Sequence, residues 1–225
     1  MSNEISSVKI TDLDPSKFRF QPVKPKSKFR PLYFDLNTLI VKFPKLRIPF
    51  DSRLNTYGQS EVSISLQCNP NNKVKTDQLI DKIKEIDDYL KELAVKEKWL
   101  EGFPADIRYN SILKVPVNSK FTPTIKAKFS KYKGEIDSVF YDANSDVLEC
   151  SELDLLNKLK KGTLILASIE FSGLFFNDKT WGMTTKFYNA KIYEAVPEVV
   201  EPIVLTSLFL ESSDSDNESG NLEDE

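Results

Sequence analysis

Two stretches decide the fold, TLILASIEF at residues 163–171 and WGMTTKFYNAKIY at residues 181–193. Apolar and polar residues alternate along both, which is the pattern of a β-strand that buries one of its faces. They are the two longest strand candidates in the chain, and residues 172–180 join them. The sequence therefore predicts a sheet-based fold in which these two strands are the largest elements.

Shorter alternating stretches precede this pair. They cover residues 39–43, 61–67, 121–129, 136–141 and 147–150. The last two flank the sequence DANSD, residues 142–146, which is typical of a hairpin turn. Within residues 121–129, Lys126 and Lys128 share the face opposite to the apolar one. We therefore expect these two lysines to point away from the core.

Two helices complete the prediction. Apolar residues at spacings of three and four, from Leu79 to Leu93, predict one long amphipathic helix over residues 76–101. Ser151 and Gly162 bracket a second, short helix as its cap and its stop signal. The expected fold is mainly β (α+β), an antiparallel barrel or sandwich with an inserted long helix and a short second helix.

Charge is distributed unevenly along the chain. The 225 residues carry a net charge of −3, but residues 1–196 hold all 31 bases and only 25 acids, a net charge of +6. This asymmetry favours a basic body that meets a polyanion. We divide the chain into a basic aromatic arm at residues 1–34, a core at residues 35–196 and a disordered acidic tail at residues 197–225.

Several classes of function are disfavoured by what the sequence lacks. There is no histidine, and the two cysteines, Cys68 and Cys150, lie far apart, which excludes a zinc site of Cys and His and any imidazole triad. Neither phosphate-binding glycine motif occurs. The adjacent Asp87 and Asp88 are expected on the exposed face of the long helix. We therefore predict a non-enzymatic protein with no catalytic residue, no metal and no cofactor.

No secretory leader and no apolar run near the roughly 18 residues of a membrane span is present. This predicts a soluble, intracellular protein without a membrane partner.

Lysine and arginine cluster in three places among aromatic residues. Six bases lie within residues 17–30 without an acid, four more lie within residues 126–133, and one follows at residue 186. Because a strand of nucleic acid is bound through its phosphates, these bases are the predicted phosphate contacts. They are Lys17, Arg19, Lys24, Lys26, Lys28, Arg30, Lys126, Lys128, Lys131, Lys133 and Lys186.

Four aromatic residues are candidates for stacking on bases. Phe175, Phe176 and Trp181 flank a polar loop, and Tyr132 lies among the lysines of residues 126–133. Such rings bind single strands because every base offers a π-face. For the first three, burial in the core is an equal alternative. Phe171 and Phe187, by contrast, are expected in the core.

The chain ends in ESSDSDNESGNLEDE, residues 211–225, with seven carboxylates and no base. Such a composition predicts disorder and a tethered polyanion that competes with nucleic acid for the basic body. The acids are Glu211, Asp214, Asp216, Glu218, Glu223, Asp224 and Glu225.

This layout resembles the replicative single-stranded-DNA-binding proteins of phages and large DNA viruses. The nearest likeness is to the nucleocytoplasmic large DNA virus type, through FPKLRIPF at residues 43–50 and NDKTWGMTTK at residues 177–186. The resemblance spans most of residues 30–194. It implies an OB-fold core, cooperative coating of single strands in replication, recombination or repair, and location at sites of viral DNA replication in the host cytoplasm or nucleus.

The resemblance also implies that the acidic tail recruits replication proteins such as DNA polymerase. A homo-oligomer is compatible with the sequence, which leaves the oligomeric state open. Tails of the phage proteins end on an aromatic residue, whereas this chain ends at Glu225. The long helix is large for an OB-fold insertion, and a protein contact is its alternative role.

Two alternative functions differ in how well they fit the sequence. A chaperone or adaptor for basic proteins such as histones would use the tail as its binding element. A nuclease is disfavoured by the missing histidines and the absence of clustered acids. The first partner we expect is single-stranded DNA.

Overall fold

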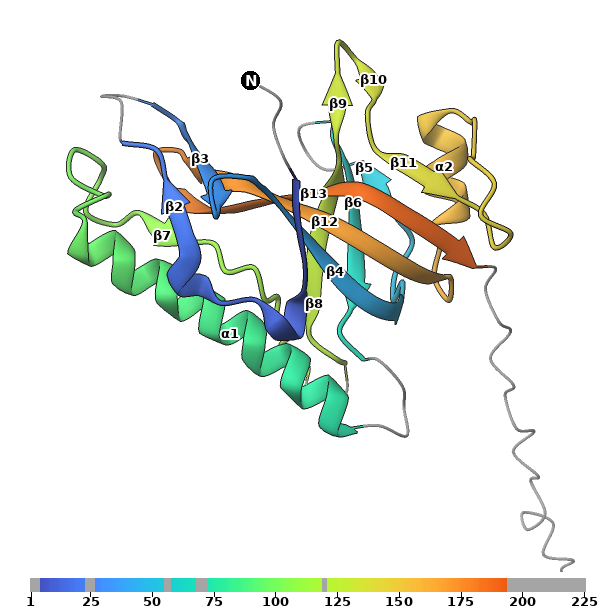
Figure 1. Cartoon of the computed structure of the whole chain (residues 1–225), viewed down its shortest axis with the longest axis horizontal. Helices are drawn as coiled ribbons and strands as arrows, with labels where there is room; N and C mark the ends of the chain where they lie inside the picture. The colour runs from blue at the N-terminus through green and yellow to red at the C-terminus, as the bar shows by residue number, and fades with distance from the viewer. Residues whose placement is uncertain (1–4, 23–26, 55–57, 68–72, 119–120, 194–225) are drawn as a thin grey trace, which may run out of the picture.

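The computed structural model describes residues 5–22, 27–54, 58–67, 73–118 and 121–193. One large mixed sheet dominates them, and a long helix runs along one side of it (Figure 1). The predicted mainly β fold with two helices is confirmed.

The centre of the sheet is the pair predicted from the alternating pattern. β12 (Leu164–Phe176) and β13 (Thr180–Tyr193) run antiparallel over nearly their whole length. A tight turn joins them, in which the Asn177 side chain accepts hydrogen bonds from the backbone N–H groups of Lys179 (2.9 Å) and Thr180 (2.7 Å). The expected nine-residue connection is therefore mostly strand.

Strands from the first part of the chain pair with β12. β4 (Thr38–Arg47) and β3 (Phe29–Phe34) lie antiparallel to it. β1 (Ile5–Lys9) pairs with β4 in parallel, and β2 (Phe18–Phe20) pairs with β3. Two single-turn 3-10 helices, η1 (Ile10–Asp12) and η2 (Pro15–Lys17), lie between β1 and β2.

The other side of β13 carries the remaining strands. β8 (Thr124–Phe129) pairs with it in parallel, β6 (Ser60–Ser65) pairs with β8, and β5 (Arg53–Leu54) pairs with β6. The short strands β7 (Arg108–Tyr109) and β11 (Val139–Tyr141) also join β13. β9 (Lys131–Tyr132) and β10 (Glu135–Ile136) form a separate hairpin.

Of the two predicted architectures, an antiparallel barrel or a sandwich, the described strands do not form the barrel. The sheet runs in the order β1-β4-β12-β13-β8-β6-β5, and among the described strands no ladder joins β1 to β5. Three strands also pair with β13 in parallel, which the alternating pattern of single strands cannot reveal. The result is an open, mixed sheet.

Both predicted helices are present. α1 spans Lys73–Lys96, so it begins three residues before Thr76, and the chain continues in turns to Gly102. Its apolar stripe is buried: Leu79, Ile83, Ile86, Leu90 and Ala94. α2 spans Glu152–Lys158, and the Ser151 hydroxyl accepts a hydrogen bond from the Asp154 N–H (3.2 Å), as a cap does.

Residues before position 35 belong to the same packed body as the rest. Five of their apolar side chains are buried in the common core: Ile10, Leu13, Phe18, Leu32 and Phe34. The Phe18 ring meets Tyr89 of α1 edge-on at 6.1 Å between centroids. The described residues before position 35 therefore share one core with the residues that follow. The tail, residues 197–225, lies outside the described residues.

Gly173 allows β3 to approach β12 closely. Its φ is +149°, and a Cβ atom there would lie 2.3 Å from the Arg30 carbonyl oxygen and 2.9 Å from the Phe29 ring. A side chain at this position would push β3 away. The close approach fixes Phe29 opposite Phe175 at one end of the sheet.

Candidate nucleic-acid interface

A large open groove lies on the polar face of the sheet around β6, β8 and β13. Its volume is about 1180 Å³. Residues of β5, the segment 110–114 and the aromatic residues Phe29 and Phe175 complete its lining. The groove thus collects side chains from parts of the chain more than 150 residues apart.

Positive charge dominates the lining. Six basic side chains and one acidic side chain, Glu61, are among the described residues that line the groove. The bases are Arg53, Lys114, Lys126, Lys128, Lys131 and Lys186. Four of them are among the predicted phosphate contacts, and the structure brings these four together.

The strands explain why the lysines face the groove. On β8, Ala127 is buried in the core, so its neighbours Lys126 and Lys128 point to the opposite face. Lys186 of β13 lies next to Lys128 in the parallel register. The expectation that the two β8 lysines point away from the core is confirmed.

Some of these lysines have partners at the groove wall. Lys126 Nζ lies 2.6 Å from Glu61 Oε1, and Lys131 Nζ lies 2.8 Å from Glu152 Oε2. Lys128 donates a hydrogen bond to Gln59 (2.9 Å). Because these pairs are partly exposed, each contributes little to stability and can open to an incoming anion.

Lys114 was not predicted. Its ammonium donates hydrogen bonds to the Asn110 side chain (2.6 Å) and to the Ser111 carbonyl. Burial lowers the pKa of Lys114, and the nearby charge of Lys126 lowers it further. A phosphate placed between these two lysines would offset the second effect. The residue lies in a stretch without alternation or local charge density, so the sequence offers little signal for it.

A buried carboxylate holds the segment that carries Lys114. Asp87 of α1 accepts hydrogen bonds from the hydroxyl groups of Tyr109 (2.6 Å) and Ser111, and from the N–H groups of Ile112 (2.9 Å) and Leu113 (3.2 Å). The expectation that Asp87 lies exposed is therefore wrong: it is the anchor of one groove wall.

Tyr109 belongs to the same anchor. Burial raises the pKa of its phenol, and the Asp87 carboxylate raises it further. The hydroxyl therefore stays protonated and keeps donating to Asp87 at neutral pH.

The four aromatic candidates lie in different environments. Phe175 is partly exposed and lines the groove. Phe176 and Trp181 are 6% and 3% exposed, and their rings stack on each other at 6.1 Å. Burial favours the core alternative for these two. Tyr132, 65% exposed on the β9–β10 hairpin, does not line the groove, and Lys133 Nζ lies 5.2 Å from its ring centre.

Phe29 is the aromatic residue that sequence reasoning missed. It is 41% exposed, it pairs with Phe175 across β3 and β12, and it lines the groove. It belongs to the basic aromatic segment at residues 17–34, which could have drawn attention to it. Phe171 and Phe187 are buried, as expected.

No protein-family model and no curated protein matches the sequence. Solved structures do show similarity. The single-stranded-DNA-binding protein encoded by bacteriophage T7 aligns with a TM-score of 0.44 and 16% identity, over 70% of this chain and 87% of that one.

A second structure is the single-stranded-DNA-binding protein from bacteriophage Enc34. It aligns with a TM-score of 0.46 and 14% identity, over 84% of this chain and 97% of that one. The same phage protein in complex with single-stranded DNA aligns with a TM-score of 0.42 and 12% identity, over 77% of this chain and 94% of that one.

The predicted N-terminal bases that the structure describes do not line the groove. Lys17 lies 3.7 Å from Asp35, and Arg19 donates to the carbonyl groups of Ser16 (2.7 Å) and Phe18 (2.8 Å). Lys28 is exposed but lines no part of it. Lys24 and Lys26 lie outside the described residues.

Arg30 differs from the prediction that it lies exposed as a phosphate contact. Its side chain is buried, because β3 packs its inner face against the end of α1 and the turns after it. It cannot lie on an open phosphate track in this arrangement.

Two further findings concern the described residues only. No group of three or more Asp, Glu, His or Cys side chains among them is arranged to hold a metal ion. None of their helices is both long and apolar enough to cross a membrane.

Proposed function

We propose that this protein binds single-stranded DNA in the groove between β5, β6, β8 and β13. The observation that carries the proposal is the groove's lining, with six bases against one acid. Such a lining concentrates positive potential in a concave surface, which attracts a polyanion and follows its phosphates. Lys126, Lys128 and Lys186 form the continuous part of this track.

The aromatic end of the groove favours a single strand over a duplex. Phe29 and Phe175 lie side by side there, and both rings are only partly buried. Bases of a single strand are free to stack on such rings, whereas those of a duplex are already stacked. We therefore assign the phosphates to the lysine track and one or two bases to Phe29 and Phe175.

Binding to a short oligo-dT and to a duplex of equal length tests the proposal. We expect tighter binding to the single strand, with an affinity that falls steeply as salt rises. Phe175→Ala should weaken oligo-dT binding by about 1–3 kcal/mol, because it removes a stacking surface. Tyr188→Ala is the matched control, since Tyr188 is exposed on β13 and lines no part of the groove. Equal affinity for both DNAs, or for neither, contradicts the proposal.

We further propose the wider role that the sequence resemblance implies. The protein would coat single strands cooperatively, as a homo-oligomer, during viral DNA replication, recombination or repair. Lys17, Arg19, Lys28, Tyr132 and Lys133 would then contact DNA beyond the groove or a neighbouring copy. The acidic tail would recruit replication proteins such as DNA polymerase.

The tail is also proposed to compete with DNA for the groove. The nine carboxylates of residues 197–225 are tethered to a body of opposite charge, so their effective concentration near the groove is high. Truncation after Val196 should therefore tighten binding to oligo-dT, by roughly 10-fold at low salt. Titrations of both lengths of the protein measure this directly. Unchanged DNA affinity together with lost binding of histones would support a chaperone for basic proteins instead.

A further inference from the structure

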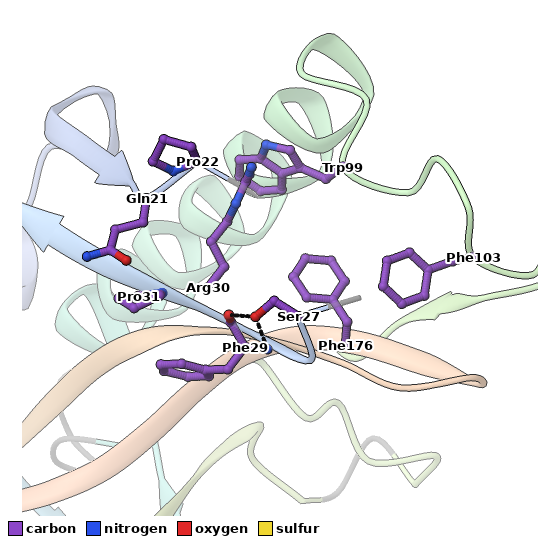
Figure 2. Close-up of a pocket in the computed structure, with 9 residues that line it drawn as sticks. All are labelled: Gln21, Pro22, Ser27, Phe29, Arg30, Pro31, Trp99, Phe103 and Phe176. Atoms are coloured by element: carbon purple, nitrogen blue, oxygen red, sulfur yellow. Dashed lines mark hydrogen bonds between the residues drawn. The ribbon is translucent and has the colours of Figure 1, made fainter. Parts of the chain in front are cut away.

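A second, smaller cavity lies next to the aromatic end of the groove. Its volume is about 270 Å³. Figure 2 shows its lining: the side chain of Arg30 extends to Trp99, and the rings of Phe103 and Phe176 lie beside it. The full lining is Gln21, Pro22, Ser27, Phe29, Arg30, Pro31, Trp99, Phe103 and Phe176.

The guanidinium of Arg30, the charged group of this pocket, has few hydrogen-bond acceptors around it. Arg30 is 7% exposed, and its Nε and Nη1 atoms have no hydrogen-bond partner among the described residues. Its nearest carboxylate oxygen is Glu97 Oε2 at 3.7 Å, which is beyond hydrogen-bond distance. That oxygen already accepts a hydrogen bond from Trp99 Nε1 at 2.6 Å. A buried guanidinium with unused donors is costly, so a ligand that supplies acceptors would stabilise it.

The walls of the pocket are suited to a flat ring. The Arg30 guanidinium lies over the Trp99 ring at 4.7 Å, and Phe103 stacks on Phe176 at 5.3 Å with planes 27° apart. Phe29 also contributes to the lining. The ligand should therefore combine apolar, planar faces with hydrogen-bond acceptors on one edge.

The pocket and the groove meet at Phe29, which lines both. Arg30 and Phe176 face the side of the sheet opposite to Phe29 and Phe175, because successive residues of a strand alternate (Figure 2). A strand that stacks a base on Phe29 and Phe175 would pass the sheet edge at Phe29, and its next nucleotide would enter the pocket there. The ligand is therefore best sought in the DNA strand itself.

We propose that this pocket accepts one base of the bound strand and prefers guanine. Guanine carries two adjacent acceptors, O6 and N7, which match one edge of a guanidinium, either Nε with Nη2 or Nη1 with Nη2. Each edge of Arg30 includes one of its two unpartnered donors. Adenine places an amino donor beside its N7 and would leave two donors facing each other. This inference rests on the proposed function, and it adds a base preference that the lysine track alone would not produce.

The test compares short oligo-dT strands that carry dG, dA, dC or dT at one central position. We expect the dG strand to bind about 5-fold or more tightly than the dA strand, from the usual discrimination by one arginine–guanine pair. Replacing that dG by 7-deazaguanine, which lacks the N7 acceptor, should remove most of the preference. Replacing it by hypoxanthine, which keeps O6 and N7, should retain it. These arms use the unmodified protein.

Two variants assign the preference to the pocket. Arg30→Gln should abolish the preference for the dG strand over the dA strand. In Trp181→Phe, Trp99 is the remaining tryptophan of two, and its fluorescence should fall more with the dG strand than with the dA strand. This second variant keeps the test valid if Arg30→Gln does not fold.

The outcomes separate the two proposals. Equal affinity for all four strands overturns the guanine pocket but leaves single-strand binding intact. Affinity that depends on a terminal phosphate and not on the base also overturns it, and would make Arg30 a phosphate contact. Failure to bind any strand overturns the proposed function and the pocket with it.

Discussion

Replacing Lys126, Lys128 and Lys186 together by alanine is expected to weaken binding of single-stranded DNA by about 100-fold at about 0.1 M salt. The three ammonium groups face one groove on neighbouring strands, so one DNA strand can meet all of them. Each phosphate contact to a single strand contributes about 0.7 to the slope of log affinity against log salt. The slope should therefore become shallower by about 2. Titrations at several salt concentrations give both quantities.

A matched control removes three charges elsewhere. Lys84, Lys91 and Lys96 are exposed on α1 and line neither cavity. Their triple replacement by alanine leaves the same net charge as the groove variant, and it should change the salt slope by much less. If both triple variants lose the same affinity, then binding follows overall charge, and the groove is not the site.

The second large effect is expected on stability. Asp87→Ala should lower the free energy of unfolding by about 3–5 kcal/mol. The change removes an acceptor used by two hydroxyl groups and two backbone N–H groups, and it leaves the N–H groups of Ile112 and Leu113 buried without that partner. Urea unfolding measures the loss. Because Lys114 follows directly, DNA affinity should also fall in the folded fraction.

Asp88→Ala provides the control for this change. Asp88 neighbours Asp87 in the chain, but its side chain is exposed and pairs with Lys91 at 2.6 Å. Exposed pairs of this kind contribute little, so the expected loss is below about 0.5 kcal/mol. A loss as large as that of Asp87→Ala would mean that helix α1, and not the buried hydrogen bonds, accounts for both effects.

The elements of the fold were predictable where one periodicity extends over many residues. The pair β12 and β13, the helix α1 and the outward face of Lys126 and Lys128 all follow from local alternation. Pairing partners are not a local property. The parallel ladder of β13 with β8 depends on contacts between residues far apart in sequence, so the barrel prediction failed there.

The candidate site was predictable only in part, for the same reason. Charge density and aromatic spacing found four of the groove's bases and Phe175. Charge density also selected Arg30, whose burial depends on Trp99, a residue 69 positions away. Asp87 looked like one of many exposed acids on α1, because its partners lie beyond the end of that helix.

The place of β13 in the sheet has a consequence for folding during synthesis on the ribosome. This strand is the last described element, yet it pairs with β12, β8, β11 and β7 and so joins the two halves of the sheet. Before β13 is synthesised, the strands that pair with β12 and those that pair with β8 have no strand between them. The groove can therefore form only after Tyr193 has left the exit tunnel, and prematurely terminated chains should not compete with the finished protein for DNA.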